Sequence, residues 1–160
     1  MIHRVYIGLG SNLESPLQQL QQAVHHIHQI PDTQVVAVSA FYGSTAVGPG
    51  EQPDYVNAAA QLETSLEAHA LLDALQAIEQ RQGRVRAPQQ WVPRTLDLDV
   101  LLFDDSVIAT DRLSVPHPRI AERNFVLQPL LDLNPQLALP DGRRVDDLLA
   151  ALPANGLWRL

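Results

Sequence analysis

Two aspartates separated by one residue stand near the start of the most strand-like apolar segment of the sequence, PRTLDLDVLLF at 93–103. A strand rises ~3.3 Å per residue and alternates its faces, so Asp97 and Asp99 are predicted to point the same way, ~6.5–7 Å apart. Two carboxylates on one half-buried face raise each other's pKa, and a positive charge between them relieves the repulsion. The pair therefore needs a cationic partner.

Two kinds of cation fit this aspartate pair. Residues 80–96 contain four arginines and no acid, so a purely structural salt-bridge cluster is one interpretation. Magnesium is the other, because it binds carboxylate oxygens at about 2.0–2.1 Å and keeps positions for substrate phosphates. Two such ions could share the aspartates, while the loop arginines bind phosphate through bidentate hydrogen bonds. Phosphoryl transfer uses this combination of metal and guanidinium, and the segment alone leaves both interpretations open.

The basic residues of the sequence are all arginine, since its 160 residues include no lysine, and they include no cysteine either. A P-loop needs a lysine on the β- and γ-phosphates, and a Schiff-base enzyme needs an amine, so both are excluded. Disulfides and thiolate sites are excluded in the same way. Any phosphate chemistry here must rest on arginine and a metal ion.

The formal net charge of −7 argues against nucleic acid or an anionic membrane as the main partner. The first residues, MIHRVYIGLG, show no leader pattern, and no window approaches the roughly 18 apolar residues of a membrane span. We therefore predict a soluble, cytoplasmic protein. Its length and its 46% of hydrophobic residues predict one globular domain over 1–160.

Hydrophobic periodicity predicts the elements that must position the aspartates. Strands are expected over 3–9, 34–42, 55–64 and 94–103. A first helix is expected to begin at Pro16, with Ser15 as its N-cap, and to end before Pro31. A second helix is expected over 67–81. Turn or loop structure is expected for GLGSN at 8–12 and for residues 43–54 and 82–93.

The order β-α-β-β-α-β predicts an α/β fold of the α+β type, with an antiparallel, ferredoxin-like sheet and two helices on one face. In the fourth strand, alternation places Leu96, Leu98, Val100 and Leu102 on the face opposite the aspartates. Later segments are expected to add helix to the other face or to an edge. They comprise a turn at Asp104-Asp105 into a short partner strand near 107–108, a helix over 124–133 interrupted near Pro129, and a helix over 145–152.

Three further residues could serve either packing or ligand binding. Trp91, in the arginine-rich loop, could cover the core or stack on a planar ligand ring. Asn57 is a polar residue in an otherwise apolar strand, and its amide could read the edge of a heterocycle. His117 stands between two prolines, within a second basic segment that contains Arg112, Arg119 and Arg123.

At PRTLDLDVLLF the sequence closely resembles the signature of the 6-hydroxymethyl-7,8-dihydropterin pyrophosphokinase family. The resemblance extends along nearly the whole chain, in four further blocks that follow the family's own order. These blocks are RVYIGLGSNL at 4–13, VSAFYGSTAVGPGEQPDYVNAAAQLET at 38–64, LLDALQAIEQRQGRVR at 71–86 and RLSVPHPRIAERNFVLQPL at 112–130. The combination is far more specific than any one block.

The resemblance implies a ferredoxin-like enzyme that transfers the pyrophosphoryl group of ATP to the hydroxymethyl oxygen of the pterin and releases AMP, in folate biosynthesis. By the family's motif, Asp97 and Asp99 would hold two Mg²⁺ ions, and Arg84 and Arg94 would assist transfer. The ATP side would comprise Gln76, Arg86, Trp91, Arg112, Ser114, His117 and Arg123. The pterin side would comprise Ser44, Val47, Tyr55, Asn57, Trp91 and Phe125. Only small-molecule partners and a monomer are expected.

Three alternatives to this function remain. One is purely structural, with the carboxylates and arginines serving only as a cluster that stabilises the fold. A pterin- or nucleotide-binding paralogue of the same fold could have lost efficient transfer, because Gln90 and Val92 stand where the family often has a basic residue and a glycine. A different metal-dependent phosphotransferase or hydrolase could use the aspartate pair and would release ADP or phosphate. The nucleotide product distinguishes the pyrophosphokinase from the last two alternatives, and a thermal stability that Mg²⁺ and an ATP analogue leave unchanged would favour the structural one.

Overall fold

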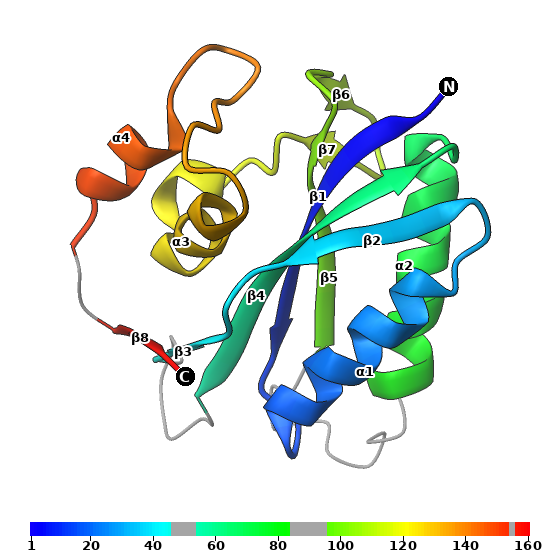
Figure 1. Cartoon of the computed structure of the whole chain (residues 1–160), viewed down its shortest axis with the longest axis horizontal. Coiled ribbons are helices and arrows are strands. Elements are labelled where there is room, and N and C mark those ends of the chain that lie inside the picture. The colour runs from blue at the N-terminus through cyan, green and yellow to red at the C-terminus, as the bar shows by residue number, and fades with distance from the viewer. Residues whose placement is uncertain (46–53, 84–95, 154–155) are drawn as a thin grey trace.

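A computed structural model describes residues 1–45, 54–83, 96–153 and 156–160 (Figure 1). The main strands are β1 (His3–Ser11), β2 (Thr33–Val38), β3 (Tyr42–Ser44), β4 (Tyr55–Thr64), β5 (Leu96–Phe103) and β8 (Leu157–Arg159). A separate two-stranded ribbon comprises β6 (Ile108–Ala109) and β7 (Ser114–Val115). The helices are α1 (Pro16–His28), α2 (Ala68–Gly83), the short 3₁₀ helix η2 (Ile120–Glu122), α3 (Asn124–Leu133) and α4 (Val145–Ala150). Within these described ranges, no helix is long and apolar enough to cross a membrane.

The six strands form one sheet in the order β5-β1-β4-β3-β8, with β2 also paired to β4. Every pairing is antiparallel. Strand β1 lies between β4 and β5 and pairs with both. It is buried on both faces, through Val5, Ile7 and Leu9 on one face and Tyr6 on the other. The predicted ferredoxin-like antiparallel sheet is confirmed.

Helices α1 and α2 cover one face of the sheet, where Leu20, Ile27, Leu71 and Leu75 complete the main core. Helix α1 begins at Pro16 as predicted, because the fixed φ of proline suits the first helical turn. Ser15 precedes it in a left-handed conformation, φ 55°, and its side chain makes no capping hydrogen bond. Ser15 therefore occupies the predicted N-cap position without contributing the side-chain hydrogen bond that usually accompanies it.

The opposite face carries α3 and α4, as Figure 1 shows. A second apolar cluster forms there around Leu127 and Leu130 of α3. Helix α3 runs through Pro129 without the predicted interruption. Pro129 lies in the second turn and removes one backbone donor, and its own burial with Leu127 and Leu130 against the sheet offsets that loss.

Several strand predictions need correction. The predicted strand 34–42 is divided into β2 and β3, and Ser39 bridges the break, donating its N–H to the carbonyl of Ala59 at 2.9 Å and accepting the Ala59 N–H through Oγ at 2.8 Å. The strand after Asp104-Asp105 pairs with β7 rather than with β5. Residues 8–11 continue β1 instead of forming a turn, because both neighbouring strands pair with them. Strand β8 was not predicted.

A register shift in β5 also changes one predicted face. Val100 pairs with Ile7 and Leu102 pairs with Tyr6, so Leu101 is the extra residue of a bulge. Leu101 and Leu102 consequently both face α3, whereas Leu96, Leu98 and Val100 face α1 and α2 as predicted. The placement of Leu102 on the latter face was wrong because simple alternation cannot anticipate a bulge.

Candidate active site

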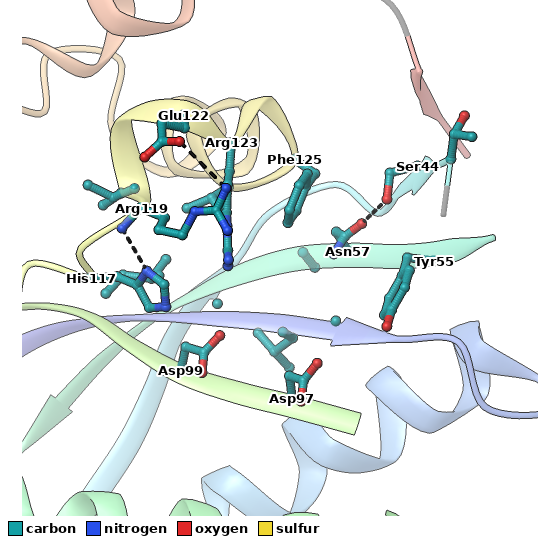
Figure 2. Close-up of a pocket in the computed structure, with 18 residues that line it drawn as sticks. Ser44, Tyr55, Asn57, Asp97, Asp99, His117, Arg119, Glu122, Arg123 and Phe125 are labelled. Carbon is teal, nitrogen blue, oxygen red and sulfur yellow. Dashed lines mark hydrogen bonds and ion pairs between the residues drawn. The ribbon is translucent and has the colours of Figure 1, made fainter. Parts of the chain in front are cut away.

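A cavity of about 450 Å³ opens on the α3 side of the sheet (Figure 2). Strands β1, β4 and β5 form its floor, and the segment from His117 through α3 forms its wall. The residues around it that matter for chemistry are Ser44, Tyr55, Asn57, Asp97, Asp99, His117, Arg119, Glu122, Arg123 and Phe125. The sheet and the α3 layer therefore meet at a hollow that collects acidic, basic and aromatic side chains.

Two glycines of β1 keep the cavity floor open. Gly10 pairs with Asp97 on one side and with Asn57 on the other, and Gly8 pairs with Asp99 and Ala59. Neighbouring strands lie about 4.8 Å apart, so backbones that flank β1 are roughly 10 Å apart. A Cβ on Gly10 would lie only 2.9 Å from Nδ2 of Asn57. Glycine here leaves room between a carboxylate edge and an amide edge.

The acidic edge consists of the two aspartates of β5. Asp97 and Asp99 project to the same side of the strand, as predicted, with Asp97 exposed and Asp99 half-buried. Burial raises the pKa of Asp99, and the nearby positive charge of Arg123 partly lowers it. A cation placed beside this carboxylate would offset the cost of ionising it in a dehydrated position.

Glu79 of α2 supports this edge from the other side of the sheet. Its Oε2 accepts a hydrogen bond of 2.7 Å from the backbone N–H of Leu98, the residue between the two aspartates. Burial raises the pKa of Glu79 to about 6, the Leu98 N–H opposes that shift, and the charges of Asp97 and Asp99 add to it. The negative charges of Asp97 and Asp99 therefore act on a third carboxyl group, Glu79. A cation bound near the three groups would reduce their mutual repulsion.

The basic wall lies opposite the aspartates. The Arg123 guanidinium lies 5.8 Å from the centre of the Phe125 ring, and Figure 2 shows it extending toward the acidic edge. Burial and the charges of Arg123 and Arg119 lower the pKa of His117. The Nδ1 atom of His117 accepts a hydrogen bond of 3.2 Å from the backbone N–H of Arg119. Arg119 also approaches Glu122, with an N–O distance of 3.6 Å. This wall offers guanidinium groups and an imidazole to an anionic ligand.

An aromatic and amide edge completes the cavity. Tyr55 and Phe125 lie on the side that holds Asn57 (Figure 2). Ser44 Oγ donates a 2.6 Å hydrogen bond to Oδ1 of the buried Asn57 and so fixes the amide plane. Flat aromatic faces beside an oriented amide suit a planar heterocycle, which stacks on rings and pairs along its edge.

The structure gathers eight predicted site residues around this cavity: Ser44, Tyr55, Asn57, Asp97, Asp99, His117, Arg123 and Phe125. Gln76, Arg112 and Ser114 are exposed and do not line it. Arg112 instead donates to Asp73 and, at 3.2 Å, to Gln76, which ties the β6–β7 ribbon to α2. The predicted residues Val47, Arg84, Arg86, Trp91 and Arg94, together with Gln90 and Val92, lie outside the described residues.

The donor set fits magnesium better than a metal that needs a full protein cage. Among the described residues, no group of three or more His, Cys, Asp or Glu side chains is arranged to hold a metal ion. Magnesium needs few protein ligands, because water and substrate phosphates complete its octahedron. Two aspartates on one face of a strand beside an open cavity provide such a small set of oxygen ligands.

Gly8, Gly10, Arg119 and Glu122 line the site but were not predicted as part of it. The period-2 placement of Gly8 and Gly10 was a signal that this part of one strand face lacks side chains. It was missed because glycines also mark turns. Nothing local in the sequence could show that the 119–122 segment folds over the aspartates.

Comparison with known proteins relates this geometry to a family. The sequence model of the family described as 7,8-dihydro-6-hydroxymethylpterin-pyrophosphokinase (HPPK) matches residues 6–135. The chain is 53% identical over 160 residues to the 2-amino-4-hydroxy-6-hydroxymethyldihydropteridine pyrophosphokinase of Pseudomonas aeruginosa, covering 100% of this chain and 98% of that relative. It is 46% identical over 155 residues to the Haemophilus influenzae protein of the same name, covering 97% and 96%.

Solved structures share the fold at low sequence identity. A Plasmodium falciparum HPPK-DHPS crystal structure, wild type with pterin and p-hydroxybenzoate, matches with a TM-score of 0.72 at 12% identity, over 94% of this chain and 42% of that one. An HPPK-DHPS complex with substrates matches with a TM-score of 0.70 at 10% identity, over 93% and 42%. The chain spans less than half of these longer proteins, so they establish its fold alone. Because the family match extends over most of the chain and the relatives align along nearly its whole length, the chain belongs to the 7,8-dihydro-6-hydroxymethylpterin-pyrophosphokinase family.

Proposed function

We propose that this protein transfers the pyrophosphoryl group of ATP to 6-hydroxymethyl-7,8-dihydropterin in folate biosynthesis. The observation that carries the proposal is one cavity in which the aspartate pair and Arg123 lie beside Tyr55, Asn57 and Phe125. A triphosphate needs the first group of residues and a pterin ring needs the second. Membership of the family and the names of the bacterial relatives support the same reaction.

The reaction forms one bond and breaks one bond. The hydroxymethyl oxygen attacks the β-phosphorus, the bond from that phosphorus to the oxygen on the α-phosphate breaks, and AMP leaves with that oxygen. The hydroxyl proton is released. Among the described residues that line the cavity, none is an obvious strong base, so positioning and electrostatic stabilisation are expected to dominate.

Asp97 and Asp99 are proposed to hold magnesium, with two ions as the expected number. Bound magnesium would neutralise charge on the bridging phosphate oxygens during transfer. The aspartates would keep that charge on the β5 side, while Arg123, which extends from the opposite wall in Figure 2, would contact the phosphates from there. Asn57 would hydrogen-bond the pterin edge between Tyr55 and Phe125.

The remaining residues are assigned to one substrate or to the other. The ATP side is proposed to comprise Gln76, Arg86, Trp91, Arg112, Ser114, His117 and Arg123. Ser44, Val47 and Trp91 are proposed to complete the pterin side, and Arg84 and Arg94 to assist transfer. We further propose that residues 1–160 act as one domain, monomeric and cytoplasmic, with no nucleic acid partner.

A product assay tests the proposal. Protein, ATP, Mg²⁺ and the hydroxymethyl pterin are incubated, and nucleotides are separated by chromatography. AMP in amounts equal to the pyrophosphorylated pterin is the expected result. ADP or phosphate instead would indicate another phosphotransferase or hydrolase, and binding without any product would indicate the impaired paralogue.

Asp97→Ala should lower kcat by about a hundredfold or more, because it removes a carboxylate that would hold magnesium, and losing one source of electrostatic stabilisation of the transition state costs that much in other active sites. Asp105→Ala is the matched control, since Asp105 is an exposed acid in the turn that follows the same strand. Near-normal turnover of Asp97→Ala would refute the metal-binding role.

A further inference from the structure

We infer that the C-terminal strand β8 positions the pterin-side edge of the active site through Trp158. This inference rests on the proposed function for the identity of the ligand. None of the residues assigned to substrates lies in β8. The structure nonetheless places β8 directly against β3, the strand that carries Ser44 to the cavity (Figure 1).

Strand β3 is only three residues long and depends on its neighbours. On one side it pairs with β4, where Tyr42 lies opposite Asn57 and Ser44 opposite Tyr55. On the other side it pairs with β8, where Gly43 lies opposite Trp158. Without β8, the outer backbone groups of β3 would have no strand partner, and a strand pair this short has little stability of its own.

The contact between Gly43 and Trp158 is unusually close. A Cβ built on Gly43 would fall on the indole, closer than 3 Å to three of its ring atoms, so the ring occupies the space of a side chain. Gly43 is buried, whereas 42% of the Trp158 surface remains exposed. One face of a large rigid ring therefore covers a glycine of the active-site strand.

Backbone hydrogen bonds extend the contact on both sides of Gly43. The Thr45 N–H donates to the carbonyl of Gly156 at 3.0 Å, and the Leu160 N–H donates to the carbonyl of Phe41 at 2.9 Å. Thr45 itself lines the cavity next to Ser44. Strand β8 thus holds β3 from residue 41 to residue 45, across the whole segment that reaches the site.

The position of β3 determines the orientation of the amide that reads the pterin. Ser44 Oγ donates to Oδ1 of Asn57 at 2.6 Å, which leaves Nδ2 beside Gly10 on the cavity floor. If β3 shifts, this hydrogen bond lengthens and the amide loses its fixed plane. On this basis Trp158 acts on pterin affinity by way of Gly43, Ser44 and Asn57, without touching the substrate.

The first experiment needs no ligand. Amide hydrogen exchange is measured by NMR in the free protein for Thr45, whose N–H bonds to β8, and for Leu62 in the centre of the sheet. Trp158→Ala should speed exchange at Thr45 by about tenfold or more and leave Leu62 unchanged, because only the local strand opens. Unchanged exchange at Thr45 would overturn the inference, and faster exchange at both sites would overturn it too, by showing general destabilisation instead.

The second experiment measures ligand affinity by calorimetry for wild type, Trp158→Ala, Trp158→Phe and Leu160→Ala. Trp158→Ala should raise the Kd of 6-hydroxymethyl-7,8-dihydropterin about tenfold, the scale of one lost hydrogen bond, and change the Kd of MgATP less than about twofold. Trp158→Phe should recover most of the loss because it keeps a flat ring. Leu160→Ala, at an exposed side chain of the same segment, should match wild type.

Equal weakening of both ligands, or no change in pterin affinity, would overturn the inference. If wild type itself binds no pterin, the proposed function fails and the inference fails with it. If wild type binds pterin normally and Trp158→Ala does too, only the inference fails.

Discussion

A methyl group added at Gly10 tests whether the open floor of the cavity sets pterin affinity. In Gly10→Ala the new carbon would lie 2.9 Å from Nδ2 of Asn57, where ordinary contact begins near 3.4 Å, so the amide must move by at least about 0.5 Å. The buried Asn57 cannot move far without straining its 2.6 Å hydrogen bond from Ser44. Losing one such bond costs about 0.5–1.5 kcal/mol, which corresponds to roughly a two- to tenfold higher Kd.

The assay is calorimetric titration with the pterin in the presence of Mg²⁺ and a non-hydrolysable ATP analogue. A thermal melt of each variant confirms that the protein is folded. The control is the double variant Gly10→Ala with Asn57→Ala, in which the amide that clashes is absent. If the methyl acts through Asn57, the double variant should bind no more weakly than Asn57→Ala alone. Additive losses in the double variant would refute the reasoning.

Three further predictions follow from the site and its surroundings. Glu79→Gln should flatten the pH dependence of stability. The pKa of Glu79 is raised to about 6 from 4.5, so its ionisation lowers the unfolding free energy of the wild type by about 1–2 kcal/mol as pH rises through that window. Denaturant titrations at pH 4.5 and 6.5 measure this free energy, and an equal change between the two pH values in both proteins would contradict the prediction. Arg112→Ala should weaken MgATP binding about tenfold in titrations while pterin affinity stays unchanged; an equal loss of pterin affinity would point to a folding defect at the Arg112–Asp73 pair. Phe125→Ala should raise the pterin Kd by roughly tenfold and leave MgATP affinity within about threefold, and the reverse pattern would remove Phe125 from the pterin side.

Local patterns in the sequence were sufficient to predict the acidic edge and the main sheet. Asp97 and Asp99 share a face because a strand alternates, and no distant contact is needed to know that. The order of strands and helices, with right-handed connections, leaves few arrangements other than the observed sheet. The absence of lysine and cysteine limits the possible chemistry through composition alone.

Only the tertiary structure decided how this edge becomes a cavity. Asn57 and Asp97 face each other across Gly10 because β4 and β5 both pair with β1, although residues 57 and 97 are far apart in the chain. The bulge at Leu101 and the pairing of β8 with β3 likewise arise from contacts between distant segments. Periodicity records which face of an element is apolar, whereas register and the raised pKa of Asp99 depend on what other segments bring against that face.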